Sequence, residues 1–369
     1  MRIAFGIVRL FPEGGLQRDC MQLARILLDR GHEVRIFTSR RDGFLNPALE
    51  ISVLPSRGLT NHMTDWKFAG AFHSAAHGHF DRVVGFNKLL GLDVLYCADP
   101  PFVTRTRGPL RALPRHRVQV RLEAASFAPE SHTQIIVLAP QLADTYAQSW
   151  NTPPERFTIL PPGINPDRRQ PHLREPQNRQ VARAALDISP DRRVWLWIGV
   201  QPYKKGLDRV VAALEHEPQT LLLTAGVGAR SNDARRALAL ASRVGAADRI
   251  RFLSHREDVA ALMAAADVLV HPARQETTGQ VVLEAVVNGL PAIVSEICGF
   301  AEHVRAADAG IVLSEPFAHG DLVRALTRLR DPNVSDSYSR NGIAYGSNPK
   351  LFSGLSTAAD LIEFSRPKG

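Results

Sequence analysis

The sequence predicts an α/β protein with two Rossmann-like domains that face each other across a cleft. The main observation is two series of short apolar runs, each run separated from the next by a segment of helix length. Such alternation is typical of a parallel sheet covered by helices on both faces. The length of 369 residues also exceeds the usual size of one hydrophobic core. Residues 161–193, rich in Pro, Arg, Asn and Gln, fit a linker between the two series.

The first series opens with a β-α-β unit. An apolar run at 2–8 predicts a buried strand, and a loop at 11–15 follows it. A helical pattern of apolar residues then ends at Gly31, before a second strand at 33–38. Further strands of this series are expected at 82–86, 94–98 and 134–138.

The second series begins after the linker. Its strands are expected at 194–198, 220–225, 250–253, 268–270 and 292–294, and its helices near 206–216, 231–244, 258–265 and 280–289. We therefore expect an N-terminal domain of residues 1–163 and a C-terminal domain of residues 164–350. Apolar residues at helical spacing predict a closing helix at about 351–369, which could pack back on the N-terminal domain. The pattern alone does not decide between the two domains.

Composition limits the partners and the compartment. There are 45 Lys and Arg against 37 Asp and Glu, a net charge of +8, which favours phosphate-bearing ligands, anionic lipid or nucleic acid. No run approaches 18 apolar residues and the start lacks the features of a signal peptide, so we expect a cytoplasmic protein. The three cysteines lie far apart and no D-x-D occurs, so we expect neither a zinc site nor a carboxylate-held metal ion.

The most specific motif is ETTGQVVLEA, which starts at Glu276 just after a predicted strand. Backbone N–H groups around Gly279, at the start of the next helix, can face a diphosphate, and the helix dipole favours that charge. Glu284 is placed to accept hydrogen bonds from ribose hydroxyls, and Glu276 from sugar hydroxyls. Thr278 and Gln280 flank the glycine and belong to the same donor-binding set. The alternative is a loop glutamate and an unrelated exposed helical one.

A second motif, Lys204-Lys205-Gly206, follows the predicted strand at 194–198. The carboxyl ends of parallel strands are where open α/β sheets bind ligands, and lysine neutralises phosphate well. In sugar transfer the departing group is a nucleotide diphosphate, so a cation there also stabilises the transition state. Because surface lysines are common, this motif alone is weak.

A third motif is Gly14-Gly15, with Asp19 about one turn further on. A glycine pair at a strand-to-helix turn lets the backbone approach a ligand closely. The pattern is not G-x-G-x-x-G, which counts against a nicotinamide-dependent enzyme. Asp19 either faces the cleft or is a first-turn carboxylate that favours the helix dipole.

A fourth feature is the segment 100–122, which has six arginines and no acidic residue. Apolar residues alternate with the charges, a composition suited to anionic lipid headgroups or phosphorylated glycolipid. A solvated basic face is the alternative, and nucleic acid is not expected as a partner because no nucleic-acid-binding motif accompanies the charge. The arginines are Arg105, Arg107, Arg111, Arg115, Arg117 and Arg121.

Taken together, the Glu276 to Glu284 pair, Lys205-Gly206 and Gly14-Gly15 resemble family 4 of the retaining GT-B glycosyltransferases. Within that family the chain is most similar to the lipopolysaccharide core glucosyltransferases. Supporting segments run through both halves of the chain and include residues 82–88 (RVVGFNK), 160–164 (LPPGI), 263–267 and 289–291.

This resemblance implies a UDP-sugar donor, UDP-glucose above all, held mainly by the C-terminal domain, and an acceptor held by the N-terminal domain. It assigns Glu284 to ribose, Gly279 and Lys205 to the diphosphate and Glu276 to the donor sugar, with Lys204 nearby. Gly14, Gly15 and Asp19 would border the sugar and the acceptor from the other side.

The resemblance further implies metal-independent chemistry with no cofactor, and a peripheral protein on the cytoplasmic face of the inner membrane. The expected reaction moves glucose onto heptose of the lipopolysaccharide inner core. Lys204 replaces an arginine of the family and residues 277–280 also depart from its pattern, which leaves both sugars open. The alternatives are a GT-B transferase using another nucleotide sugar for O-antigen or exopolysaccharide, and a non-catalytic glycolipid-binding protein at a membrane surface.

Overall fold

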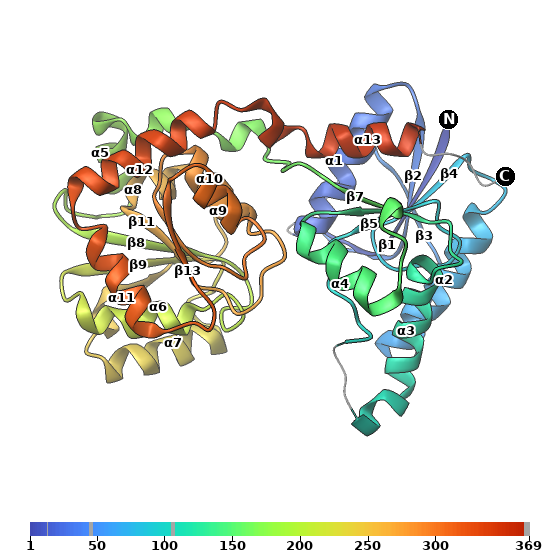
Figure 1. Cartoon of the computed structure of the whole chain (residues 1–369), viewed down its shortest axis with the longest axis horizontal. Helices are drawn as coiled ribbons and strands as arrows, with labels where there is room; N and C mark the ends of the chain where they lie inside the picture. The colour runs from blue at the N-terminus through green and yellow to red at the C-terminus, as the bar shows by residue number, and fades with distance from the viewer. Residues whose placement is uncertain (13, 44–46, 105–107, 365–369) are drawn as a thin grey trace. The chain divides into compact units, whose positions relative to one another are not determined.

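The computed structural model describes residues 1–12, 14–43, 47–104 and 108–364. The chain divides into two compact units, one formed by Met1–Gly163 with Phe352–Gly369 and the other by Ile164–Leu351. Each unit contains one sheet flanked by helices, and every described strand pairing is parallel (Figure 1).

The first unit is built on a sheet with the order β3-β2-β1-β4-β5-β6-β7. β1 lies between β2 and β4, with Ile3 opposite Val34 on one side and Arg82 on the other. The chain therefore winds outward in one direction from β1 and in the other from β4, and the order reverses between these two strands. The strands are β1 (Arg2–Leu10), β2 (Glu33–Arg41), β3 (Glu50–Val53), β4 (Arg82–Gly85), β5 (Val94–Cys97), β6 (Gln134–Val137) and β7 (Phe157–Ile159).

Two groups of helices cover the two faces of this sheet. α1 (Gly15–Asp29) and α13 (Gly354–Phe364) share one apolar core, to which Leu27 and Ile362 contribute. On the other face lie the helices that pack their aromatic and aliphatic side chains into a second core: α2 (Asn61–Ala76), α3 (Pro114–Phe127) and α4 (Pro140–Trp150). Two short 3-10 helices complete the unit, η1 (Gly108–Ala112) and η2 (Pro154–Arg156).

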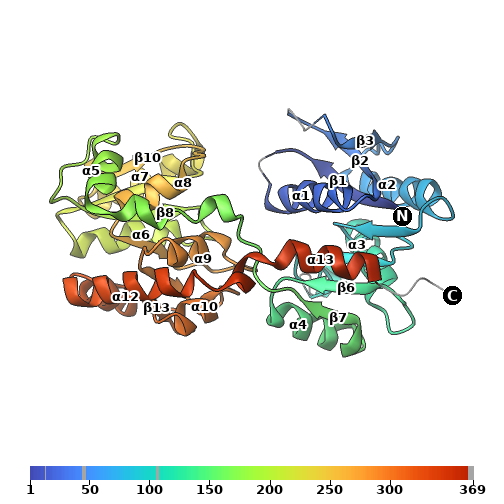
Figure 2. The ribbon, with the colours of Figure 1, turned by 90° about the horizontal axis from the view of Figure 1, so that it is seen from above.

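The C-terminal helix α13 belongs to the first unit, although its sequence follows the second (Figure 2). Arg30 at the end of α1 donates hydrogen bonds to Asp360 at 2.7 Å and to Glu363 at 2.8 Å. His32 Nε2 also lies 2.7 Å from Glu363. Polar contacts at one end and the shared apolar core therefore fix the helix on α1.

The second unit is built on a sheet with the order β10-β9-β8-β11-β12-β13, and its strand order reverses between β8 and β11. Trp195 and Trp197 of β8 are fully buried on one face and Leu196 on the other. The strands are β8 (Arg193–Ile198), β9 (Thr220–Ala225), β10 (Ile250–Phe252), β11 (Val268–His271), β12 (Ala292–Ser295) and β13 (Gly310–Leu313).

Eight α-helices of the second unit are described. They are α5 (Pro176–Ala184), α6 (Leu207–Ala213), α7 (Asn232–Arg243), α8 (Val259–Ala265), α9 (Gln280–Val287), α10 (Ala301–Ala306), α11 (His319–Arg328) and α12 (Pro332–Tyr345). The 3-10 helices are η3 (Pro166–Arg168), η4 (Pro171–Arg174), η5 (Leu214–His216), η6 (Ala247–Arg249) and η7 (Pro349–Phe352). Throughout the described ranges, no helix has both the length and the apolar character that crossing a bilayer requires.

The structure differs from the sequence-based expectation at the supposed linker 161–193. This segment contains α5 and two 3-10 helices and packs against α8. Arg174 donates to the carbonyl oxygens of Met263 and Ala266, and Arg183 to that of Ala265. The last carbonyl groups of a helix lack partners within it, so arginine side chains satisfy them here. Arginines that suggested a solvated linker therefore hold the segment in the second unit.

Candidate functional site

Three side chains meet at the point where the strand order of the second unit reverses. Lys205 lies in the loop after β8, His271 ends β11, and Glu276 lies in the loop after β11. Lys205 Nζ is 2.5 Å from Glu276 Oε2, and His271 Nε2 is 3.0 Å from the same oxygen. Parallel strands bring their carboxyl ends to one edge, where such sheets bind ligands. Two of the expected residues thus form an ion pair, with His271 as a third member.

The cluster fixes the charge of Glu276. Burial alone would raise the pKa of this carboxyl, but the neighbouring His271 and Lys205 lower it to about 2. An ionised carboxylate only accepts hydrogen bonds, so the proton between it and His271 lies on Nε2 of the histidine. Neither here nor elsewhere in the described ranges do three or more His, Cys, Asp or Glu side chains gather as a metal ion would require.

The loop carrying Lys205 is tied to the loop carrying Glu276. The N–H of Arg274 donates to the carbonyl of Lys204 at 2.7 Å, and Trp197 Nε1 donates to that of Lys205 at 3.1 Å. Gly206 has φ +74°, and a Cβ there would overlap the Pro272 carbonyl oxygen. This close approach requires glycine. The side chain of Lys204 is exposed, unlike that of Lys205.

Gly279 is the N-cap of α9 and has a left-handed conformation, with φ +86°. A Cβ there would overlap Cys298 Sγ. The carbonyl of Thr278 accepts from the Phe300 N–H at 2.7 Å and from the Cys298 thiol at 3.2 Å, which fixes this turn. Burial and the nearby charge of Glu276 together raise the pKa of Cys298 to about 12, so the sulfur remains a thiol. The half-buried side chains of Gln280 and Glu284 follow on the first turns of α9.

In the first unit, Gly14 is the N-cap of α1 and Gly15 its first residue. A Cβ on Gly14 would overlap the Gln17 side chain, whereas one on Gly15 would meet nothing within 4 Å. Asp19, one turn into α1, accepts a hydrogen bond of 3.0 Å from the Tyr96 hydroxyl. Burial raises the pKa of Asp19 above its usual range, although Tyr96 and Arg18 oppose the shift.

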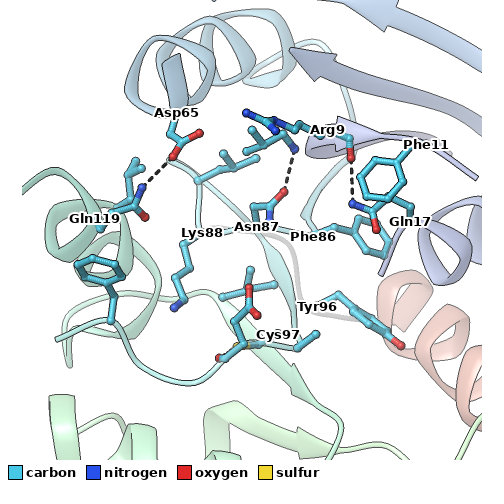
Figure 3. A pocket seen from close by; sticks show the side chains of 17 residues that line it. Arg9, Phe11, Gln17, Asp65, Phe86, Asn87, Lys88, Tyr96, Cys97 and Gln119 are labelled. Carbon is cyan, nitrogen blue, oxygen red and sulfur yellow. Dashed lines mark hydrogen bonds between the residues drawn. The ribbon is translucent and has the colours of Figure 1, made fainter. Parts of the chain in front are cut away.

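A pocket of about 310 Å³ opens beside these residues, at the carboxyl ends of β1, β4 and β5 (Figure 3). Sequence reasoning missed it because α2 and α3 supply part of its wall. The segment 82–88 was the available signal, since it places Asn87 and Lys88 directly after β4. The lining residues are Val8, Arg9, Phe11, Gln17, Asp65, Phe86, Asn87, Lys88, Leu89, Leu95, Tyr96, Cys97, Ala98, Asp99, Phe102, Gln119 and Leu122.

A buried carboxylate supports this pocket. Glu123 of α3 is fully buried and accepts from Lys88 Nζ at 2.7 Å and from Trp150 Nε1 at 2.8 Å. The backbone N–H of Phe102 donates to it at 2.6 Å. Glu123 therefore joins the loop after β4, the loop after β5 and α4.

The arginine-rich segment forms η1 and α3. Arg111, Arg115, Arg117 and Arg121 are exposed, and the Arg121 guanidinium lies 5.0 Å from the centre of the Trp66 ring. Two leucines in the same stretch are also exposed, Leu110 at 56% and Leu113 at 51%. Cationic and large apolar side chains thus reach solvent side by side. Arg105 and Arg107 lie outside the described residues.

Known proteins resemble this chain along nearly its whole length. Residues 178–344 match the family described as glycosyl transferases group 1, and residues 13–168 match glycosyltransferase family 4. The chain is 36% identical to lipopolysaccharide glucosyltransferase WaaG of Escherichia coli K12, over 98% of each chain. It is 27% identical to D-inositol 3-phosphate glycosyltransferase of Stackebrandtia nassauensis, over 95% of this chain and 86% of that one.

Solved structures share the fold. The crystal structure of WaaG, a glycosyltransferase involved in lipopolysaccharide biosynthesis, matches with a TM-score of 0.90 and 35% identity over 98% of this chain and 100% of that one. Anabaena HepE in complex with UDP-glucose matches with a TM-score of 0.74 over 98% of each chain, and at 18% identity it shows the fold alone. The architecture of two Rossmann-like sheets is the GT-B fold, as the sequence predicts.

Proposed function

The chain belongs to glycosyltransferase family 4, and on that basis we propose that it transfers glucose from UDP-glucose to heptose of the lipopolysaccharide inner core, with retention of configuration. The name of the E. coli relative supports glucose and lipopolysaccharide. UDP-glucose is also a ligand that the shared fold can hold, as in Anabaena HepE.

The observation that carries the proposal is the pair of Lys205 and Glu276 where the strand order of the second unit reverses. The ionised Glu276 can accept hydrogen bonds from hydroxyls of the donor sugar. Lys205 can neutralise the diphosphate, both when the donor binds and when UDP departs. Removing one such electrostatic contact from an active site typically costs about 100- to 1000-fold in turnover.

The donor would extend along the start of α9. Gly279, between Thr278 and Gln280, gives the diphosphate access to backbone N–H groups of the first turn, where the helix dipole favours negative charge. Glu284 would bind the ribose hydroxyls, and the exposed Lys204 would add positive charge at the rim.

The acceptor would bind the first unit, bordered by Gly14, Gly15 and Asp19. Its hydroxyl attacks the anomeric carbon while Lys205 and the start of α9 stabilise the departing UDP. The raised pKa of Asp19 suits a group that takes the proton of that hydroxyl, because a carboxylate of higher pKa is a stronger base. Orientation of the acceptor is the alternative role.

The exposed arginines of η1 and α3 would hold the protein on the anionic cytoplasmic face of the inner membrane, where a lipid-linked acceptor is accessible. Each cation near such a surface contributes about 1 kcal/mol of attraction. The exposed Leu110 and Leu113 would enter the boundary between headgroups and acyl chains.

The reaction is tested by UDP release from UDP-glucose, UDP-galactose and UDP-N-acetylglucosamine, each with and without a heptose-containing core acceptor and in the presence of chelator. We expect acceptor-dependent release from UDP-glucose that withstands the chelator, and at least a 100-fold loss in Glu276→Ala. Equal turnover in Glu276→Ala would refute the assigned site. Release from another sugar would favour a different glycan, and no release would favour a non-catalytic glycolipid-binding protein.

A further inference from the structure

The pocket of the first unit lies where its strand order reverses, between β1 and β4 (Figure 3). This crevice is where open α/β sheets bind ligands. Its volume of about 310 Å³ is at the lower end for small-molecule sites, which suits one sugar ring better than a chain of them. The proposed function places the acceptor on this unit without naming the groups that recognise it.

Several polar groups of the pocket have hydrogen-bond donors or acceptors that make no hydrogen bond within the described residues. Asn87 uses its side-chain oxygen to accept from the Val8 N–H at 2.8 Å, which leaves its amide N–H groups as donors. Asp65 accepts from Gln119 through Oδ2 at 2.8 Å, which leaves Oδ1 as an acceptor. Within the described residues, Asn87 Nδ2, Asp65 Oδ1 and the carboxylate of Asp99 have no hydrogen-bond partner.

The charges of the pocket disfavour an anion inside it. Lys88 is neutralised by Glu123, and it also donates to the Pro100 carbonyl at 3.3 Å. Among the described residues Asp65 and Asp99 form no such ion pair, although the exposed Arg9 also lines the pocket. A phosphate would meet like charge from both carboxylates and, as an acceptor, could use none of their free oxygens.

A hydroxyl group fits these surroundings because it both donates and accepts a hydrogen bond. Donors on Asn87 and acceptors on Asp65 and Asp99 can therefore serve neighbouring hydroxyls of one ring. Aromatic side chains, Phe11, Phe86 and Phe102 among them, supply apolar wall for the carbon skeleton.

We propose that this pocket binds a neutral, polyhydroxylated sugar ring of the acceptor, that Asp65 and Asn87 contact its hydroxyls, and that any phosphate on the acceptor stays outside. The assignment rests on the proposed function, because it takes the acceptor to be a glycan. It adds the position of the acceptor ring, the exclusion of its phosphate groups and the residues that select for it.

Two isosteric variants test the pocket. Asp65→Asn replaces an acceptor oxygen by a donor, and Asn87→Asp does the reverse while its other oxygen still accepts from Val8. The matched control is Asp144→Asn, which removes an exposed carboxylate from α4 away from the pocket. The substrate is a heptose-containing core oligosaccharide, used both with its phosphate groups and after their removal.

With saturating UDP-glucose, we expect kcat/KM for the acceptor to fall about 10- to 100-fold in each pocket variant, as for a lost hydrogen bond to a charged group. The loss should be the same with and without phosphate. The KM for donor and the slow hydrolysis of UDP-glucose without acceptor should match those of wild type and of Asp144→Asn. Unchanged acceptor kinetics, or a loss confined to the phosphorylated acceptor, would overturn the assignment.

A binding measurement distinguishes failure of the pocket assignment from failure of the proposed function. Absence of turnover in wild type counts against the function, and saturation-transfer difference NMR with the same oligosaccharide then judges the pocket. Ring-proton signals present in wild type and Asp144→Asn but lost in both pocket variants support the assignment. Signals kept in Asp65→Asn and Asn87→Asp, or missing in wild type, overturn it.

Discussion

Replacing Gly279 by alanine should destabilise the second unit through two separable effects. The residue has φ +86°, a conformation that costs a residue with a Cβ about 1–2 kcal/mol. The new methyl group would also overlap Cys298 Sγ, which is 1% exposed and held by its hydrogen bond to Thr278. Overpacking of this kind costs about 1–3 kcal/mol. The free energy of unfolding should therefore fall by about 2–5 kcal/mol.

Cys298→Ala distinguishes the two effects. Alone it removes a buried thiol and one hydrogen bond, a loss of about 1 kcal/mol. In Gly279→Ala/Cys298→Ala the overlap is gone and the backbone strain remains, so the double variant should be more stable than the sum of the single losses by about 1–3 kcal/mol.

Urea unfolding of the wild type and the three variants measures this coupling. The donor KM of Gly279→Ala should also rise, since the start of α9 must shift to admit the methyl group. Additive losses, or a Gly279→Ala protein as stable as wild type, would refute the close packing of Gly279 on Cys298.

Four further predictions concern charge. The pKa of Glu276 falls from an ordinary 4.5 to about 2 on folding, so its stabilisation is present above pH 4.5 and is lost as the pH falls toward 2; the stability difference between wild type and Glu276→Gln should shrink by about 2 kcal/mol between pH 5 and 3 in urea titrations. Tyr96→Phe removes a hydrogen bond that favours ionised Asp19, so the acidic limb of the kcat/KM profile should move to higher pH. Glu123→Gln leaves Lys88 without its buried partner and should lower the free energy of unfolding by about 3 kcal/mol. The last prediction concerns four exposed arginines of η1 and α3, namely Arg111, Arg115, Arg117 and Arg121. Their replacement by glutamine should weaken cosedimentation with anionic vesicles at least 10-fold.

Each of these four predictions has an outcome that would contradict it. A constant difference between wild type and Glu276→Gln across pH would mean that this carboxyl has its usual pKa, and an unmoved limb in Tyr96→Phe would exclude Asp19 as its source. Glu123→Gln as stable as wild type would mean that Lys88 needs no partner. The control for the vesicle experiment replaces four exposed arginines of the second unit by glutamine: Arg235, Arg236, Arg243 and Arg328. An equal loss of cosedimentation in this control would indicate that net charge, and not a defined surface, drives binding.

Most strands that sequence reasoning found have continuous buried apolar runs, such as Val194 to Trp197. The edge strand β10, in which only Ile250 is buried, is an exception. Sequence reasoning missed β3, β7 and β13, which are three or four residues long, lie at sheet edges and are only partly buried. An edge strand has one pairing partner and needs little apolar surface, so its sequence carries a weak signal. Its existence depends on the neighbouring strand, which local patterns do not report.

The residues of the candidate site likewise divide into those that sequence patterns locate and those that they do not. Lys205 and Glu276 follow strands that pattern alone locates, and their contact follows from the adjacency of β8 and β11. His271 precedes a proline at a strand end, and nothing local indicates that its side chain turns to Glu276. Asp65 and Gln119 lie 54 residues apart in sequence, on two different helices, so their meeting is a result of tertiary packing. In the sequence, the arginines that cap α8 likewise look solvated, because their role as caps depends on the folded position of that helix.

The anomeric configuration of the product tests the central claim most directly. Wild-type protein incubated with UDP-glucose and the heptose-containing core acceptor should give one new glucosyl residue, and proton NMR should show an anomeric coupling typical of the α configuration of the donor. A β-linked glucose would contradict the retaining mechanism, and the absence of any glucosylated heptose would contradict the proposed acceptor.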